Sequence, residues 1–516
     1  MLIYNTASGR KEPFEPEALP VKMYVCGLTP KNEPHLGHGF LFTVNDMVRR
    51  YLEYRGYPVR YVQNFTDVDD KIIAAGHREG IPPAAAAQRY TASYFRDMDA
   101  LNVRRADDFT YVTAYIPDII AVVAGLIEQG HAYPLDGDVY FSVPSFPNYG
   151  RLSGRDEEAM RVGERVKATK ANEDKRDPRD FALWKAAKPG EPSWESPWGP
   201  GRPGWHIECS TMVLKALGER IDIHGGGSDL IFPHHENEIA QSESYTGKAP
   251  FVRYWLHTGM LSLPDPDAPV SAGEATARKT LKMAHSGTFI PISAVLATGQ
   301  VPAPALRLYL LSQHYHQNMT YSEEQLLATV KRWRRWVEAR ATLTRLIAWA
   351  DLSPQAHSPA RGGEPEVATA ARRAKGGAFA GAIKEARTAF IAAMDDDFNT
   401  SAALAVVDGL VSRVNEYAAG LGGARATAAQ LKQLRVGLAG LEELAGVLGI
   451  ALDAPEAVNQ DMKAEIDAKL AQREEARKAK NWAESDRIRQ EIEETYVVVV
   501  KDTAQGPVWA SKPKES

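Results

Sequence analysis

Hydrophobic positions follow two different spacings in the first part of the chain. A run of β-forming residues covers 21–25 and leads into a polar turn. Apolar residues then return every three to four positions from Phe40 to Arg55. The first pattern predicts a strand and the second an amphipathic helix. A further apolar run over 59–65 predicts the next strand. Strand, loop, helix and strand in this order predict the start of a doubly wound α/β domain.

The pattern changes twice further along the chain. Residues 131–203 are rich in Pro, Gly, Trp and charge and interrupt the α/β pattern, whereas strand signals fade after about residue 303. Helical periodicity then takes over, with a gap rich in Ala, Arg, Gly and Pro. We expect a Rossmann-like domain in two halves at 1–130 and 204–302, an insertion at 131–203, a helical region at 303–351, a flexible link at 352–376, a helical bundle at 377–455 and a small α+β region at 456–516.

Charge and cysteine content narrow the classes of function. A net charge of −5 over 516 residues argues against a protein that coats nucleic acid through bulk charge, although a local basic surface stays possible. No apolar run is long enough to span a bilayer, and the first residues do not resemble a secretion signal. We therefore expect a cytoplasmic protein without a membrane partner. The only two cysteines, Cys26 and Cys209, do not suggest a disulfide framework.

Cysteine, histidine and glutamate residues suggest a metal site. His234 and Glu238 are spaced to lie one turn apart on one helical face. Cys26 and Cys209 complete a set of two thiolates, one imidazole and one carboxylate, which are all ordinary zinc ligands. His235 is a rival imidazole. Because the residues are dispersed, spacing alone leaves two core cysteines and a salt-bridged helix as the other interpretation. We expect the cysteines on opposite walls of one site, each at the end of a separate strand.

Three further motifs are typical of nucleotide contact. His35–Gly39 follows a strand and opens a helix, so its backbone can approach a ligand and its histidines can donate to phosphate oxygens. His224–Asp229 follows another strand, and its aspartate can accept from ribose hydroxyls. The basic segment Lys279–Phe289 can neutralise charge on a phosphoryl group. The simpler interpretations are a surface histidine pair, a strand-to-helix turn and an ordinary surface loop.

These motifs, taken together, resemble those of cysteinyl-tRNA synthetase, a class I aminoacyl-tRNA synthetase. The resemblance runs over nearly the whole chain, through the blocks Tyr24–Thr29, His35–His38, Asn64–Ile72, Arg202–Ser210, Ile231–Glu238, Met394–Thr400 and Arg473–Arg489. It implies that cysteine, ATP and Mg²⁺ give cysteinyl-adenylate, and that the cysteinyl group then passes to the 3′ end of tRNA(Cys). It also implies a monomer with an acceptor-end insertion, a stem-contact region at 303–351 and an anticodon-binding region at 456–516.

The resemblance assigns roles to individual residues. One zinc ion per chain would be bound by Cys26, Cys209, His234 and Glu238. The family's ATP contacts fall on His35, Gly37, His38, Gly227, Asp229, Lys282 and His285. The amino-acid pocket falls near Gly27, Thr29, Thr66 and Trp205. Candidate tRNA contacts are Arg473, Arg477, Trp482, Asp486 and Arg489. Zinc prefers a thiolate to a hydroxyl, so it would separate cysteine from serine without an editing site.

One signature departs from the family. The family reads Lys-Met-Ser-Lys-Ser, whereas this chain reads Lys282-Met-Ala-His285-Ser286, so a histidine replaces the second lysine. Histidine carries a charge less fully at neutral pH, and we expect slower activation. Two alternatives stay open: a catalytically silent paralogue that binds tRNA or cysteine, and a ligase that joins cysteine to an amino-sugar. The altered signature supports the first, while the block at 394–400 and the tail from Lys469 argue against the second.

Overall fold

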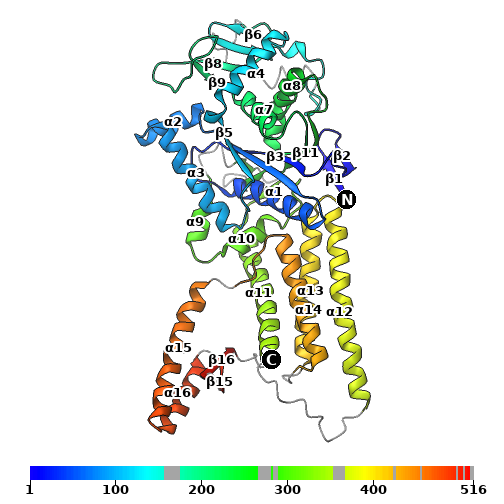
Figure 1. Ribbon diagram of the computed structural model, residues 1–516, viewed down its shortest axis with the longest axis vertical. Helices are drawn as coiled ribbons and strands as arrows, with labels where there is room; N and C mark the ends of the chain where they lie inside the picture. The colour runs from blue at the N-terminus through cyan, green and yellow to red at the C-terminus, as the bar shows by residue number, and fades with distance from the viewer. Residues whose placement is uncertain are drawn as a thin grey trace, which may run out of the picture. The chain divides into compact units, whose positions relative to one another are not determined.

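The structure is a computed structural model that describes residues 1–155, 175–264, 280–282, 289–351, 366–421, 426–453, 456–495, 498–503 and 506–511. It divides into two compact units, coloured along the chain in Figure 1. The α/β unit comprises Met1–Leu326 together with two short later segments, Ala393–Ser401 and Val447–Gly449. The helical unit comprises the rest of the chain from Leu327.

A five-stranded parallel sheet forms the centre of the α/β unit. Its strand order is β11 (Val252–Thr258), β10 (Ile221–Gly227), β3 (Val21–Leu28), β4 (Val59–Phe65) and β5 (Asp108–Tyr111). Within this sheet the chain forms the middle strand β3 first and adds strands outward on both sides, which confirms the predicted doubly wound arrangement. The order reverses between β3 and β10, and ligands of such sheets bind outside the carboxyl ends of the strands at this point.

Helices and smaller sheets surround the central sheet. The helices of the α/β unit are α1 (Leu36–Tyr54), α2 (Asp70–Glu79), α3 (Pro83–Ala100), α4 (Ile116–Glu128), α7 (Trp205–Ala216), α8 (Glu236–Thr246), α9 (Ile292–Ala297) and α10 (Ala303–Leu310). Short hairpin strands are β1 (Leu2–Asn5) with β2 (Arg10–Pro13), and β12 (Leu261–Pro264) pairs with β13 (Thr280–Lys282) and β14 (Met319–Thr320). Short helical turns are η1 (Val112–Ala114), η2 (Val143–Ser145), η3 (Ser228–Leu230) and η4 (Ile231–His235).

The region 131–203 contains an antiparallel sheet of its own. Its order is β6 (Ala132–Leu135), β7 (Asp138–Phe141), β8 (Phe181–Ala186) and β9 (Gly201–Pro203). Apolar side chains of this sheet, such as Phe141 and Trp184, share one buried cluster with Ile207 and Met212 of α7. The insertion and the second half of the α/β unit therefore have a common core.

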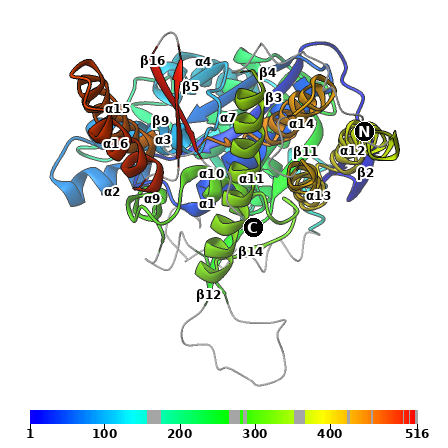
Figure 2. The ribbon, with the colours of Figure 1, turned by 90° about the horizontal axis from the view of Figure 1, so that it is seen from below.

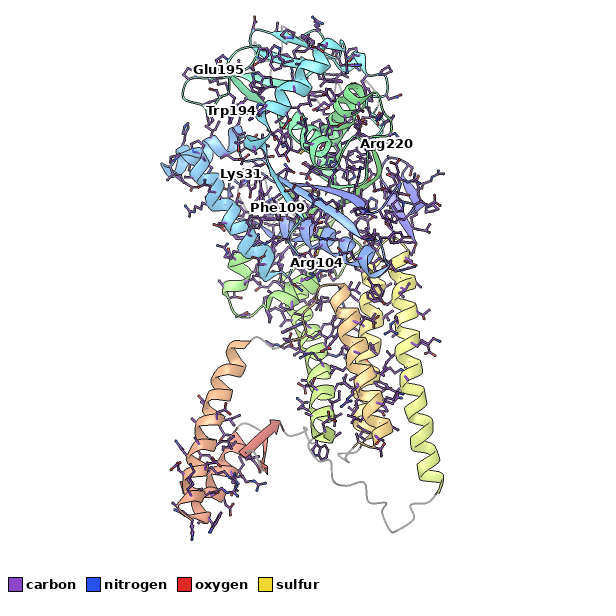
Figure 3. All side chains as sticks on the ribbon, viewed as in Figure 1. Lys31, Arg104, Phe109, Trp194, Glu195 and Arg220 are labelled. Atoms are coloured by element: carbon purple, nitrogen blue, oxygen red, sulfur yellow. The ribbon has the colours of Figure 1, made fainter. Side chains whose placement is uncertain are left out.

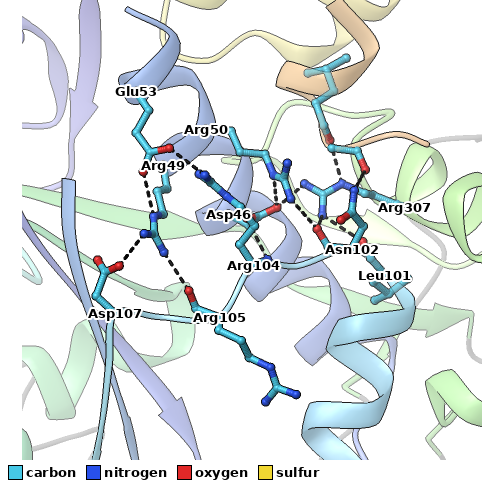
Figure 4. A network of polar contacts seen from close by, with 12 residues as sticks. Asp46, Arg49, Arg50, Glu53, Leu101, Asn102, Arg104, Arg105, Asp107 and Arg307 are labelled. Atoms are coloured by element: carbon cyan, nitrogen blue, oxygen red, sulfur yellow. Dashed lines mark hydrogen bonds and ion pairs between the residues drawn. The ribbon is translucent and has the colours of Figure 1, made fainter. Parts of the chain in front are cut away.

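A buried polar network fixes α1 along its length (Figure 4). The guanidinium of Arg307 on α10 is fully buried and ion-pairs with Asp46 Oδ2 of α1 at 2.6 Å. It also donates to the carbonyl oxygens of Leu101, at 3.0 Å, and of Leu448, at 2.7 Å. A buried arginine needs such partners, because an unpaired charge away from water costs several kcal/mol. Arg307 therefore joins α1 to the segment Val447–Gly449.

The helical unit contains long helices and a terminal hairpin. The bounds are α11 (Glu323–Asp351), α12 (Glu366–Asp395), α13 (Thr400–Gly420), α14 (Ala428–Val447), α15 (Glu456–Lys478), α16 (Trp482–Thr495), β15 (Val498–Thr503) and β16 (Gly506–Ser511). Figure 2 shows β15 and β16 side by side, as their antiparallel pairing requires. α12 begins inside the range expected as a link, whose first part, 352–365, lies outside the described residues. None of the described helices is long and apolar enough to cross a bilayer.

Candidate metal centre and nucleotide cavity

Four side chains from four separate elements meet in the core of the α/β unit. Cys26 lies near the carboxyl end of β3, Cys209 on α7, His234 in η4 and Glu238 in the first turn of α8. Cys26 Sγ lies 3.9 Å from Cys209 Sγ and 3.7 Å from Glu238 Oε1, and His234 Nε2 lies 3.0 Å from the same carboxylate oxygen. All four ligand atoms lie within 4.8 Å of one another, and all four residues are buried. This cluster can hold a metal ion.

The expected position of Cys209 at the end of a strand is wrong. The residue lies one turn into α7, which starts directly after the short strand β9. Gly204 allows this change of direction, because a Cβ there would lie only 1.9 Å from the carbonyl oxygen of Ala182. In the same way Gly225 to Gly227 belong to β10 itself, whereas the sequence suggested a turn. A three-residue strand and a strand of glycines both lack the side-chain pattern that predicts strands.

Electrostatics in the cluster favour a bound cation. The hydrogen bond from Cys26 lowers the pKa of the Cys209 thiol to about 6, against the effect of burial. Burial would raise the pKa of Glu238, but His224 and His234 lower it to about 2. Burial would lower the pKa of His234, but the Cys209 thiolate and the Glu238 carboxylate raise it to about 10. The core therefore holds a thiolate and a carboxylate against one imidazolium, and a bound cation would offset the remaining negative charge.

A second set of ligand atoms shares this centre. Cys26, His224, His235 and Glu238 also lie within 4.8 Å of one another, so His235 stays a rival imidazole. His235 Nε2 lies 3.3 Å from Cys26 Sγ, and its other ring nitrogen lies 2.7 Å from His257 Nε2. The two sets share a thiol and a carboxylate and are alternatives around one centre. Only the first set uses both cysteines.

Further imidazoles lie around the cluster and contact its ligands. The sequence analysis did not identify them in this role. His206 Nδ1 lies 2.9 Å from His234 Nδ1, and His224 Nε2 lies 2.9 Å from Glu238 Oε2. His257 approaches the cluster through His235, and its Nδ1 lies 2.8 Å from Thr6 Oγ1. Such neighbours orient metal ligands. The only available signal was the density of histidines between 206 and 257, because the contacts join residues far apart in the sequence.

The two histidines at the start of α1 accept hydrogen bonds from nearby backbone N–H groups, and these bonds define the tautomer of each ring. His35 is the N-cap residue, and its Nδ1 accepts a hydrogen bond from the Gly37 N–H at 3.1 Å. His38 Nδ1 accepts from the His35 N–H at 3.2 Å, and the two rings stack 3.7 Å apart. Burial lowers the pKa of His35 to about 4 and that of His38 well below its usual value. Both rings are therefore neutral near pH 7 and carry their proton on Nε2, which makes them donors.

A cavity of about 290 Å³ lies between the metal cluster and the histidine turn. Its lining includes Cys26, Gly27, Thr29, His35, Gly37, His38, Gly227 and Asp229, all named from the sequence. It also includes Lys31 and Lys71, which sequence reasoning did not assign. The N-terminus of α1 at its wall adds the positive end of the helix dipole. One cavity thus presents hydrogen-bond donors at one end and a thiol of the metal cluster at the other.

Other residues named for the amino-acid and ATP sites are not part of the described cavity lining, and one of them lies outside the described residues. The Trp205 ring lies 4.4 Å from the His234 ring, so it packs on the metal cluster. Thr66 is buried, and its hydroxyl lies 3.3 Å from Glu208 Oε2. The backbone of Lys282 pairs with Ser262 in β13. His285 lies outside the described residues.

The residues named for tRNA differ in exposure. The Trp482 side chain is 58% exposed, and Asp486 is exposed as well, so both are accessible to a ligand. Arg473 is buried at 3% exposure, which is unlike a surface contact. Arg489 pairs with Glu493 at 3.3 Å. Residues 479–481 separate α15 from α16, and Lys480 there has a positive φ of 57°.

Comparison with known proteins identifies the class and then the family. The model of the "tRNA synthetases class I (C) catalytic domain" matches residues 14–331, a "DALR domain" matches 389–453, and the "Cysteinyl-tRNA ligase anticodon binding domain" matches 459–509. The fold is shared with methionyl-tRNA synthetase from Mycobacterium tuberculosis in complex with methionyl-adenylate, at a TM-score of 0.54 and 17% identity, over 83% of this chain and 90% of that one. The α/β unit is thus the catalytic domain of a class I aminoacyl-tRNA synthetase.

Full-length relatives define the family more narrowly. The chain is 46% identical to "Cysteine--tRNA ligase" of Moorella thermoacetica over 99% of both chains, and 45% identical to that of Heliobacterium modesticaldum over 98% of both. It is 43% identical to the same enzyme of Gloeobacter violaceus over 98% of both. The chain belongs to the cysteine--tRNA ligase family. This confirms the family expected from the sequence, and neither the silent paralogue nor the amino-sugar ligase is favoured.

Proposed function

We propose that the chain activates cysteine with ATP and transfers the cysteinyl group to the 3′ end of tRNA(Cys). The observation that carries the proposal is that Cys26, which meets Cys209, His234 and Glu238 in one cluster, lines the same cavity as His35 and His38. A thiol-binding centre and a phosphate-binding helix start are the two recognition elements that cysteine and ATP require. Membership in the cysteine--tRNA ligase family supports the same reaction.

We propose zinc as the metal, one ion per chain. Four-coordinate zinc with bonds of about 2.3 Å to sulfur and 2.0–2.1 Å to nitrogen or oxygen needs sulfurs about 3.8 Å apart and nitrogen and oxygen about 3.3 Å apart. The distances between Cys26 and Cys209, 3.9 Å, and between His234 and Glu238, 3.0 Å, fit this requirement. When bound, zinc would coordinate the thiolate of the substrate and leave serine without an equivalent contact.

The protein's own groups carry out the rest of the ATP recognition. The Nε2–H groups of His35 and His38 donate to phosphate oxygens, and the N-terminus of α1 adds its dipole. The carboxylate of Asp229 accepts from ribose hydroxyls, where it and Gly227 line the cavity. Because both imidazoles are neutral, they orient the phosphates as donors and leave charge neutralisation to Mg²⁺ and to lysines.

We also propose how the remaining regions engage tRNA. The insertion at 131–203 would contact the acceptor end, the helices at 303–351 the stem, and the region 456–516 the anticodon. The match of residues 459–509 to an anticodon-binding domain supports the last assignment, and the exposed ring of Trp482 is suited to stacking on an unpaired base. The proposal includes a cytoplasmic location and a monomeric state. Size-exclusion chromatography of the pure protein would test the monomeric state.

The decisive experiment is cysteine-dependent exchange of pyrophosphate into ATP by zinc-loaded protein. We expect exchange with cysteine at a rate at least about 10⁴ times that with serine, because the proposed zinc contact needs a thiolate and a serine hydroxyl cannot replace it. Serine serves as the matched control. Zinc-loaded protein that binds cysteine but does not exchange pyrophosphate into ATP would be a silent paralogue. Activation of cysteine without charging of tRNA(Cys) would favour ligation of cysteine to another acceptor.

A further inference from the structure

Lys31 is a partly buried cation at the wall of the nucleotide cavity. It lies in the turn between β3 and α1 (Figure 3), where its N–H donates to the Thr29 carbonyl at 2.9 Å. Its side chain lines the cavity together with His35 and His38. The ammonium group is near enough to both imidazoles that its charge contributes to lowering their pKa values. Lys31 therefore stands beside the two donors assigned to phosphate.

The carboxylates near Lys31 have other partners. Glu33 also lines the cavity, but it accepts from Arg96 at 2.9 Å and from Ser93 at 3.0 Å. Asp69 caps α2 by accepting the Lys71 N–H at 2.8 Å. Among the described residues, no carboxylate oxygen lies within 4.0 Å of Lys31 Nζ. Burial and the nearby Lys71 lower the pKa of Lys31, although Asp69 acts in the opposite direction.

The charged ammonium group of Lys31 has an unfavourable free energy at this partly buried position unless an anion enters the cavity. Asp69 only partly offsets the partial removal of water from Lys31, and no carboxylate pairs with its ammonium group among the described residues. Lys71 is a second positive group in the lining, which also contains the carboxylates of Glu33 and Asp229. The adjoining groups are the Nε2 donors of His35 and His38 and the N-terminus of α1, all of which also favour negative charge. The cavity wall is therefore built for an anion with several oxygens, and a triphosphate has that chemistry.

We propose that Lys31 contacts the triphosphate of ATP and supplies positive charge beside the neutral His35 and His38. The proposal rests on the proposed ATP-dependent activation and names a further residue for it. Two features of this chain make the contribution important. The histidines are neutral donors, so they bring no formal charge. The signature from Lys282 to Ser286 has a single lysine, so one cation fewer comes from that segment.

The test compares Lys31→Met, which removes the charge and keeps the length, with Lys31→Arg, which keeps the charge. In pyrophosphate exchange, we expect Lys31→Met to raise the KM for ATP about tenfold or more, because a charge-assisted contact contributes about 1.5–3 kcal/mol. The KM for cysteine and the zinc content should stay within twofold of the parent, and Lys31→Arg should recover most of the loss. Lys248→Met is the matched control, since Lys248 is exposed and pairs with Glu219.

Equilibrium dialysis of ATP in the absence of cysteine separates this proposal from the proposed function. Weaker ATP binding by Lys31→Met than by the parent supports the contact, even in protein that shows no exchange. A parent that binds ATP without cysteine-dependent exchange contradicts the proposed activation alone. An ATP affinity and KM of Lys31→Met within twofold of the parent overturn the role of Lys31, and so does equal loss of cysteine and ATP affinity, which would indicate general distortion.

Discussion

The metal cluster and the histidine turn lie at two ends of one cavity, yet they are built in different ways. Cys26, Cys209 and the pair His234 and Glu238 come from three segments that are separated in the sequence. His35 and His38 come from one turn of α1 and bond to each other's backbone. The cluster depends wholly on the tertiary core, whereas the bonds between the two histidines are local to a helix cap. The turn has one distant support, since the Leu36 N–H donates to the Ile290 carbonyl at 3.1 Å.

The two ends also differ in their charge states. The cluster contains a thiolate and a carboxylate with lowered pKa values, and a bound cation would offset their negative charge. The histidine turn is neutral, because burial lowers the pKa of each imidazole. Under the proposed function, the cluster would select its ligand through a metal and the histidine turn through oriented donors. The two ends should consequently respond differently to mutation and to pH.

The largest expected effect comes from removal of a cluster ligand. Cys209→Ala should lower the affinity for zinc by more than about 100-fold, since loss of a mere supporting residue already costs 10–100-fold. Exchange activity should fall to background with it. Zinc content by mass spectrometry and exchange rates measure the effect. Thr211→Val, a buried change on the same helix at a hydroxyl without a partner among the described residues, is the control and should keep its zinc. Full zinc content in Cys209→Ala would favour the set that contains His235.

A smaller effect is expected at the histidine turn. His38→Asn keeps an acceptor near the position of Nδ1, so the cap on His35 should persist, but it lacks the Nε2 donor. We expect an exchange rate lower by about 100-fold, the scale seen when one positioned donor is lost. Zinc content and melting temperature should not change. A large drop in melting temperature without a specific loss of rate would instead make His38 a residue of the cap alone.

The smallest effect concerns pH. The pKa of His35 is about 4 when folded and about 6.5 when unfolded, so the unfolded chain binds more protons between these values. Stability is therefore retained above pH 6.5 and falls as the pH drops toward 4, by at most about 1.4 kcal/mol per pH unit, because one proton differs between the two states. The melting temperature of the parent should fall more steeply over this range than that of His35→Asn. Parallel curves would mean that His35 titrates normally.

The sequence predicted local features better than contacts between distant segments. The strand before Cys26, the helix after His35 and the helix containing Glu238 all have regular patterns, and they occur where expected. The helical position of Cys209 was missed because a three-residue strand and one glycine set its start. Likewise, a lone lysine in a turn has no periodicity, so the position of Lys31 at the cavity becomes visible only when the fold is known.

The composition of the α/β unit has a consequence for synthesis of the protein. Ala393–Ser401 and Val447–Gly449 belong to this unit although most of the helical bundle separates them from its other residues in the sequence. Asp397 accepts the Tyr4 N–H at 2.8 Å, and the Leu448 carbonyl accepts from the buried Arg307. Chains grow from the N-terminus, and domains generally fold as units during synthesis. The first residues to leave the ribosome therefore cannot form these contacts until residues more than 390 positions later have been synthesised. The catalytic domain is complete only once residue 449 has left the ribosome.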